Sequence, residues 1–599
     1  MPPPRNTEAS HACFHGCCPT PFRDLPESQT TVIPGSADAS RHDFVVATVS
    51  SLHPNAYFTN HESLPSFKEL FACFNEVYPQ FSQTNLGDRI RDREYYHLSL
   101  SKHVCLDYIG HGLFSFSQME SQHPVASSSS SPLPSFQSLT LEPSFFNISY
   151  KSVKLNSQIL YGNGSQELEF ESKLKKRIMD FMNISESDYF MVFTANQSSA
   201  FKLLAEYYPF QSDRDLLTVY DHESEAVKVM IDSSKKKGAH VSSAEFRLPN
   251  LGIQTAKLRK KMVSKKRKKQ NRGLFVFPPQ SRVTGSRYSY QWMTMARENG
   301  WHVMLDACAL GPKDMETLGL SLFKPDFLIC SFFKIVGENP SGFGCLFIKK
   351  SSASVLQDST STGVGIVSLV PASGPSQLPE ESENEETQLK KTEGTNPKSE
   401  IKELETPFES RNSALECRGL DHADSLGQIL ISIRAKCLIN WLVNALISLR
   451  HPNSEASVSA VKIYGPKITF DRGPAVAFNV IDWKGEKIDP ALVQKLADRN
   501  NISLSVGLLQ HVEFSDKHEE EREMMFEIGT GEEGGTQISG QRGDKIPPRI
   551  NVVTVTLGLL TNFEDVYRLW AFVSRFLDAD FVEKERWRYK ALNQKTIEL

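Results

Sequence analysis

Long apolar runs, a charge excess of one sign and regularly spaced cysteines are all missing from this sequence of 599 residues. Its most apolar stretch, residues 426–449, is interrupted by Arg434 and Lys436, so we expect no transmembrane helix. A formal net charge of −4 predicts neither bulk nucleic-acid binding nor membrane attachment. The ten cysteines are scattered, which indicates a reducing compartment.

The N-terminus also lacks the apolar core of a secretory signal, and Glu8, Asp24 and Glu27 argue against an organellar transit peptide. We therefore expect a cytoplasmic protein. The segment HACFHGCC (11–18) offers ligands for a metal or cysteines for acylation, but no second ligand pair follows at the spacing of a zinc finger. We favour a solvated tail and no metal site.

The chain is too long for one hydrophobic core, and its composition divides it into segments. We predict a disordered tail over 1–40, an N-terminal segment with the large domain over 41–350, a low-complexity linker over 351–412, a connecting helix over 413–457, and a small α/β domain over 458–599 with an acidic insertion at 511–545.

Three short apolar stretches between residues 301 and 349 indicate buried strands of a mostly parallel sheet. The first, WHVMLD, ends at Asp306. The second, DFLICS, ends at Ser331 and is followed by Lys334. The third begins after Gly342 with Gly344, which permits a tight return. Ligands of such sheets bind at the carboxyl ends of the strands, so we expect Asp306 and Lys334 to face one crevice.

A buried aspartate and a buried lysine have two interpretations. They can form an ion pair that only fixes the strands. Alternatively, they can hold pyridoxal 5'-phosphate, with Lys334 forming the Schiff base and Asp306 pairing with the pyridine nitrogen. Phe332 and Phe333 would desolvate Lys334 and favour its neutral, nucleophilic form.

LDACAL and KPDFLICSFFKIVG, together with FPPQSRVTG (277–285) and LDYIGHGLFSF (106–116), resemble the molybdenum cofactor sulfurase family, in particular its plant branch. That family is part of the cysteine-desulfurase-like class V of fold-type I pyridoxal-phosphate-dependent transferases. The resemblance runs from about residue 95 to about residue 580. It implies an α/β fold with a large, mostly parallel sheet, a smaller C-terminal α/β domain and a homodimer.

The resemblance also implies a set of cofactor-binding residues. His222 matches the histidine that stacks on the pyridine ring, which makes it a catalytic candidate with Lys334. Gln280 matches a residue near the phenolic edge of the ring, and Ser281 and Ser331 lie at strand ends facing the same crevice. Gln197 and Ser198 match residues that bind the phosphate at a helix N-terminus. The full candidate set is Lys334, Asp306, His222, Gln280, Ser281, Ser331, Gln197 and Ser198.

Four positions depart from the family pattern. Asn196 replaces a glycine, which is tolerable if its backbone is left-handed, and Arg282 places a cation where a neutral polar side chain is usual. The loop that carries the persulfide cysteine matches Leu508–Gln510, and no cysteine follows Cys437. The arginine that grips the substrate carboxylate matches Thr554. We further expect the C-terminal molybdenum-cofactor-binding module of full sulfurases to be missing.

These features predict a transferase- or lyase-like protein that binds pyridoxal phosphate and acts on a small amino compound rather than on cysteine in the standard way. The alternative is a catalytically degenerate scaffold or interaction protein of the same fold. The basic run at 257–272 leaves nuclear import or a polyanion site open. Because this run lies between elements of the large domain, we favour a solvated helix face and consider nucleic-acid binding the weakest alternative.

Overall fold

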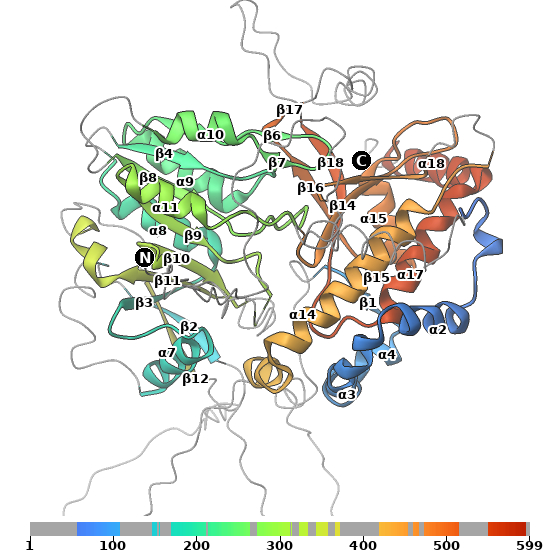
Figure 1. Ribbon diagram of the computed structural model, residues 1–599, viewed down its shortest axis with the longest axis horizontal. Helices are drawn as coiled ribbons and strands as arrows, with labels where there is room; N and C mark the ends of the chain where they lie inside the picture. The colour runs from blue at the N-terminus through green and yellow to red at the C-terminus, as the bar shows by residue number, and fades with distance from the viewer. Residues whose placement is uncertain are drawn as a thin grey trace, which may run out of the picture.

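The computed structural model describes residues 57–107, 146–151, 155, 169–210, 214–263, 272–311, 313, 323–332, 343–356, 366–371, 418–452, 459–466, 472–513 and 549–594. These residues form a large and a small α/β domain that lie side by side (Figure 1). The predicted α/β fold with a mostly parallel sheet and a smaller C-terminal domain is confirmed. The HACFHGCC segment, Lys334 and most of the acidic insertion lie outside the described residues.

A seven-stranded sheet forms the centre of the large domain, in the order β3-β11-β10-β9-β8-β4-β5. Its strands are β3 (Tyr189–Thr194), β11 (Gly344–Lys349), β10 (Phe327–Ser331), β9 (Trp301–Asp306), β8 (Gly273–Phe277), β4 (Asp215–Thr218) and β5 (Val241–Ser243). Only β11 runs antiparallel to its neighbours within this sheet. The carboxyl ends of β4, β8, β9 and β10 therefore lie at one edge.

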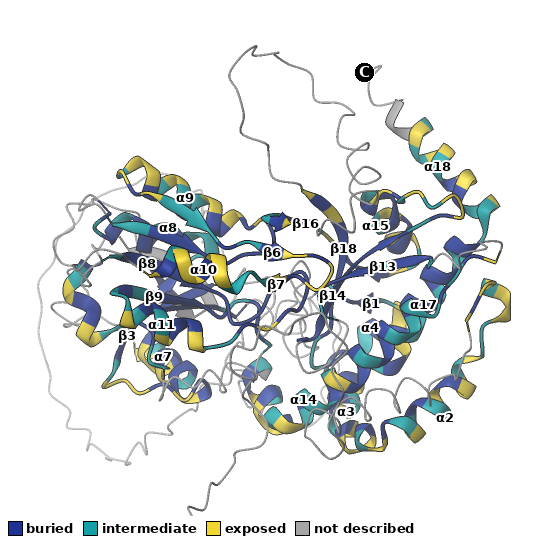
Figure 2. Ribbon diagram, turned by 45° about the horizontal axis from the view of Figure 1, so that its top comes forward, coloured by how far each residue is buried: buried dark blue, intermediate teal, exposed yellow. Residues whose placement is uncertain are grey.

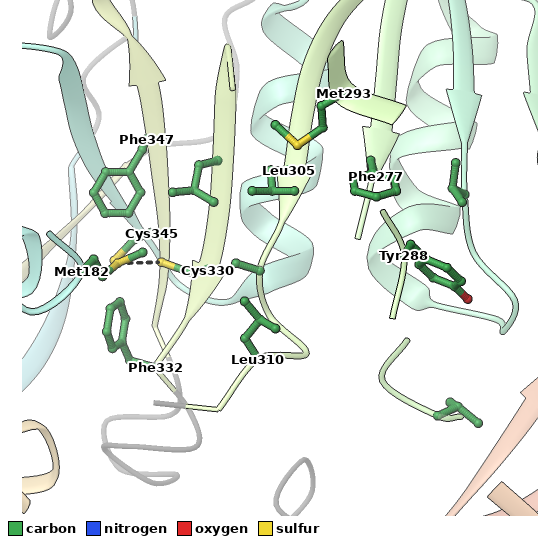
Figure 3. Close-up of a cluster of buried hydrophobic side chains, with 14 of the residues drawn as sticks. Met182, Phe277, Tyr288, Met293, Leu305, Leu310, Cys330, Phe332, Cys345 and Phe347 are labelled. Carbon is green, nitrogen blue, oxygen red and sulfur yellow. Dashed lines mark hydrogen bonds between the residues drawn. The ribbon is translucent and has the colours of Figure 1, made fainter. Parts of the chain in front are cut away.

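Helices cover both faces of this sheet, because its strands alternate apolar side chains between two cores. The helices are α7 (Glu169–Phe181), α8 (Gln197–Tyr207), α9 (Glu225–Lys236), α10 (Thr255–Met262) and α11 (Gln291–Glu298). Met304 packs with α8 and α9 on one face, whereas its neighbours Val303 and Leu305 pack with α7, α10 and α11 on the other. In Figure 3 Phe332 and Phe347 flank Cys330 and Cys345 in this second core.

The small domain contains an antiparallel sheet in the order β13-β14-β18-β16. Its elements are β13 (Val461–Tyr464), β14 (Ala475–Val480), α15 (Pro490–Arg499), β15 (Ile502–Ser503), β16 (Ser505–Leu509), β17 (Val512–Glu513), β18 (Ile550–Thr556), α17 (Phe563–Ser574), the 3-10 helix η8 (Arg575–Leu577) and α18 (Ala579–Gln594). β17 pairs with β6 (Phe246–Arg247), which also pairs with β7 (Gly252–Ile253). This three-stranded sheet joins the two domains.

The N-terminal segment packs on the small domain, although we predicted it as part of the large-domain unit. It comprises η1 (His61–Ser63), α2 (Phe67–Val77), η2 (Pro79–Thr84), α3 (Asn85–Glu94), α4 (Tyr96–Leu100) and β1 (Val104–Cys105). β1 pairs with β15, and Phe74 of α2 packs against Phe563 of α17 with the ring centroids 4.5 Å apart and the ring planes tilted by 33°. In both ribbon views these helices lie beside α17 (Figures 1 and 2). Their aromatic side chains cover the small-domain core, which composition alone could not indicate.

Part of the predicted linker over 351–412 also belongs to the large domain. The 3-10 helix η4 (Lys350–Leu356) continues from β11, and β12 (Ile366–Pro371) pairs antiparallel with β2 (Phe146–Lys151) along six residues. Ile366, Val367 and Leu369 are buried. The linker prediction was wrong for these residues. The apolar run of β12 is only six residues long, and the Ser-, Pro- and Gly-rich residues around it dominate the composition of the stretch.

The connecting helix is α14 (Arg418–Ile447), with a break at Gly427, whose φ is 73°. By length and composition the segment Gly419–Ile447 could cross a membrane, but half of its most apolar window is buried inside the protein. Arg434 lies within it, almost fully buried, and bonds Asp88 at 2.5 Å. Leu438, Leu442 and Leu446 join the small-domain core. We therefore interpret α14 as a core helix.

Candidate cofactor site

Asp306 ends β9 and points its carboxylate into a buried polar cluster. It is 4% exposed and accepts hydrogen bonds from the Tyr220 hydroxyl at 2.8 Å and the Cys308 backbone N–H at 3.0 Å. The Gln197 amide lies 3.4–3.5 Å from both carboxylate oxygens. β9, the β4 end and the start of α8 therefore converge on one carboxylate. Among the described residues no lysine or arginine forms an ion pair with it.

Tyr220 was not among the sequence-based candidates. Burial, followed by the nearby charge of Asp306, raises the pKa of Tyr220 well above its ordinary value, so the phenol stays protonated and donates its hydrogen to Asp306. The one available signal was its place in the sequence, where Tyr220 precedes Asp221 and His222 immediately after a buried strand. Its ring contacts that of His222 edge-on, with the centroids 6.0 Å apart.

His222 is held by a second buried carboxylate, that of Asp221. The two side chains are 2.7 Å apart at Nδ1 and Oδ1, and Asp221 also accepts the hydroxyls of Ser281 at 2.7 Å and Thr284 at 2.6 Å. Burial by itself would raise the pKa of Asp221, but these three partners together hold it below its ordinary value. The ionised Asp221 thus orients the His222 ring. The hydroxyl hydrogen of Ser281, which we predicted near the cofactor, is directed to Asp221.

Replacing Asp221 by asparagine should lower the free energy of unfolding at pH 7 by about 1–3 kcal/mol, because three hydrogen bonds lose their charged acceptor. The folded-state pKa is depressed, so this stabilisation is present above the unfolded value of about 4 and is lost as pH falls through the folded value. Urea unfolding of the wild type and of Asp221→Asn at decreasing pH measures this effect, because the difference between their free energies of unfolding should become smaller. Asp180→Asn on the exposed face of α7 is the control. A difference that stays constant with pH would contradict the charged state of Asp221.

Both ends of the Gln280 amide have partners. Its nitrogen donates to the Ala309 carbonyl at 3.2 Å, and its oxygen accepts from Arg287 Nε at 3.4 Å. A side chain at Gly473 would lie 2.0 Å from the Gln280 oxygen, so this position accommodates only glycine without a shift. Gln280 is therefore fixed at the contact between the two domains.

The loop between β3 and α8 brings a helix N-terminus to the sheet edge at which Asp306 lies. Asn196 caps α8 by accepting the Ser199 N–H at 2.8 Å. Its φ of −161° is extended, so the left-handed backbone that we considered for this residue is not observed. Ser198, the predicted phosphate ligand, lies in the first turn, where backbone N–H groups favour an anion. Gln197 instead turns its amide toward Asp306.

β10 delivers the last candidates. Ser331 ends this strand and lies opposite Gly344 of the neighbouring strand β11. A side chain at Gly344 would lie 2.8 Å from the Thr194 Oγ1 and 2.9 Å from the Asn196 carbonyl, which explains the glycine there. Lys334 follows three residues after Ser331 and lies outside the described residues. The structure thus brings together Asp306, Gln197, Tyr220, His222 and Ser281, with Gln280 adjacent in the chain.

The segment that matches the family's persulfide loop is held by hydrogen bonds to the large domain. The Leu508 carbonyl accepts the Glu223 N–H at 2.8 Å, and the Gln510 N–H donates to the Asp221 carbonyl at 2.9 Å. The Gln510 side chain donates to the His222 carbonyl at 2.9 Å. Leu508 and Leu509 belong to β16, so this segment is a paired strand that carries no thiol and contacts the backbone of residues 221–223.

Thr554, which matches the carboxylate-binding arginine, is likewise held by a hydrogen bond within the protein. It is 4% exposed, lies in β18, and donates its hydroxyl to the Val283 carbonyl at 3.0 Å. Arg282 is half-buried nearby, and its charge opposes the effects of burial and of Asp306 on the pKa values of Tyr220 and Cys308.

No family model matches this chain. The molybdenum cofactor sulfurases of Solanum lycopersicum, Bos taurus and Homo sapiens are 23, 27 and 25% identical to it over 87, 58 and 81% of its length. The chain covers 61, 38 and 50% of those proteins, or about half their length.

Among solved structures, the cysteine desulfurase of Thermococcus onnurineus NA1 has a TM-score of 0.47 at 15% identity, covering 82% of this chain and 98% of that one. Cysteine desulfurase CsdA of Escherichia coli has a TM-score of 0.46 at 14% identity, with the same two coverages. The sequence comparisons thus confirm the resemblance that the motifs indicated: this chain is similar to molybdenum cofactor sulfurases over most of its length.

Proposed function

We propose that this protein binds pyridoxal 5'-phosphate between its two domains and acts on a small amino compound. The observation that carries the proposal is the buried carboxylate of Asp306, which has neutral donors but no ion pair among the described residues. A buried carboxylate without a cation is costly. The pyridinium nitrogen of the cofactor would supply a cationic partner for Asp306.

The residues present fit this cofactor. Asp306 would hold the ring nitrogen, His222 would lie against the ring, and the N-terminus of α8 with Ser198 would bind the phosphate. When bound, the cofactor supplies an electron sink for reactions at the carbon next to an amine. Tyr220 would keep Asp306 oriented, and Asp221 would keep the His222 ring in place. Lys334 is proposed as the point of covalent attachment.

We propose a substrate other than cysteine, because both residues on which a cysteine desulfurase depends are replaced. A mobile thiolate is needed to accept sulfur, whereas Leu508–Gln510 carries none and is hydrogen-bonded to the large domain. Thr554 contacts a backbone carbonyl. A homodimer and a cytoplasmic location complete the proposal, and sedimentation of the purified chain tests the former.

The test of a substrate is a screen of small amines and amino acids by difference absorption with the cofactor-loaded protein. We expect a saturable change in the visible spectrum with at least one amine other than cysteine. The change should be absent from Lys334→Ala. If no amine changes the spectrum of the loaded protein, the alternative gains support: a scaffold that keeps the fold but catalyses no reaction.

A further inference from the structure

A pocket lined by residues of both domains lies next to Gln280, which contacts two of its lining residues, Arg287 and Gly473. One face of α14 forms one wall, and the loops at 472–474 and 557–559 form the others. Its lining includes three cationic side chains, Arg287, Lys436 and Arg472, and among the described residues it includes no aspartate or glutamate. The positive charges of these three side chains repel each other, and a bound anion would offset this repulsion.

Arg472 differs from the other buried cations of the described chain. Arg91, Lys175, Lys313 and Arg434 are the other lysines and arginines among the buried residues. Each of them pairs with a carboxylate within 3.1 Å. Arg472 is 2% exposed, and its described partners are backbone carbonyls alone. Backbone carbonyls thus satisfy its hydrogen bonds, and within the described ranges no carboxylate neutralises its charge.

The carbonyl partners of Arg472 belong to both domains. Its Nη1 donates to the Thr284 carbonyl at 2.9 Å and to the Ala475 carbonyl at 2.8 Å, and its Nε donates to the Pro466 carbonyl at 2.6 Å. Burial lowers the pKa of Arg472 to about 9, which leaves it charged at neutral pH. A fixed positive charge thus lies at the wall of the pocket, with Arg287 and Lys436 exposed at its mouth.

Arg287 connects the pocket to the candidate cofactor site. It lines the pocket and donates from Nε to the oxygen of Gln280, the residue matched to the phenolic edge of the ring. Thr554, where a carboxylate-binding arginine would be expected, offers no charge. The apolar remainder of the lining comes from Ile431, Ile439, Pro474, Leu557 and Leu559. An amino compound with an acidic group on a partly apolar body matches this combination.

We propose that this pocket binds the carboxylate of the amino substrate, with Arg287, Lys436 and the fixed charge of Arg472 replacing the cation missing at Thr554. The assignment of the anion to the substrate rests on the proposed function. The anion site itself does not, because a simple dicarboxylate can report on it without any reaction.

The experiment measures succinate and inorganic phosphate binding to the full chain by calorimetry, at low salt. We expect succinate to bind and the double variant Arg287→Gln, Lys436→Gln to bind it at least about tenfold more weakly, since charge-assisted contacts are lost. Both residues are exposed, so the fold should survive. Lys228→Gln, an exposed lysine on α9, is the matched control and should bind as the wild type does. Equal succinate binding by all three proteins, or none by the wild type, would overturn the site.

A second arm separates the site from the proposed function. Acidic amino compounds that change the visible spectrum should compete with succinate, and neutral amines should not. Succinate binding that depends on Arg287 and Lys436, without spectral response to any amine, would support the site and reject the proposed function. A spectral response to acidic amines that the double variant leaves unchanged would reject the site and keep the function. Tighter binding of phosphate than of succinate would contradict the carboxylate assignment.

Discussion

Lys334→Ala should lose all covalent attachment of pyridoxal phosphate, while the wild type retains it through gel filtration. The reason is chemical, because a Schiff base needs a primary amine and Lys334 follows the strand β10 directly beside β9, which ends at Asp306. Borohydride treatment of the loaded protein followed by peptide mapping should place the label on the peptide that contains Lys334. The variant should still unfold cooperatively.

The matched control for this change is Lys350→Ala, an exposed lysine that follows the antiparallel strand β11. It should carry the label as the wild type does. A label on another lysine, together with unchanged covalent binding by Lys334→Ala, would show that the attachment site is wrong. Loss of the folded state in Lys334→Ala would instead favour the structural ion pair, since breaking such a pair destabilises the fold.

Sulfide release from cysteine should not exceed that of free pyridoxal phosphate. Losing a bidentate arginine at the position of Thr554 costs about 2–4 kcal/mol in binding a carboxylate. The absence of a thiol at Leu508–Gln510 removes the sulfur acceptor itself. Sulfide assays with and without reductant measure the result.

Two outcomes would revise this expectation in different ways. Release that survives replacement of every cysteine in the chain would mean that the protein removes sulfur without a persulfide on its own residues. Release that disappears with Cys17→Ser alone would mean that the N-terminal cluster supplies the thiol. Cys437→Ser is the comparison variant, because burial raises the pKa of Cys437 to about 11 and keeps it protonated.

The strands that carry the site were predictable because each is a short apolar run that ends in a polar residue. This pattern placed Asp306 and Ser331 at one edge of the sheet, where the structure has the ends of β9 and β10, whereas His222 was assigned from the family resemblance. The antiparallel direction of β11 was not predictable, since an apolar run carries no mark of its direction. Tyr220 was missed because a tyrosine that follows a strand more often packs in the core than donates a hydrogen bond to a functional carboxylate.

Long-range pairings were the other part that sequence could not provide. The pairing of β2 with β12 joins residues more than 200 positions apart, and the hydrogen bonds of Gln510 to Asp221 and His222 join segments almost 290 apart. Neither leaves a periodic signal in the chain. The anion pocket likewise depends on Arg287, Lys436 and Arg472, which are distant in sequence and meet only at the domain contact.

The most direct test of the central claim is thermal unfolding of the full chain with and without excess pyridoxal phosphate, with the visible spectrum recorded on the same samples. At 100 times the dissociation constant, binding should add about 2.7 kcal/mol to the free energy of unfolding, and a visible band should remain after gel filtration. Asp306→Asn should weaken both effects while the variant stays folded. If the wild type is not stabilised and retains no visible band, the proposal that this protein binds pyridoxal phosphate is contradicted.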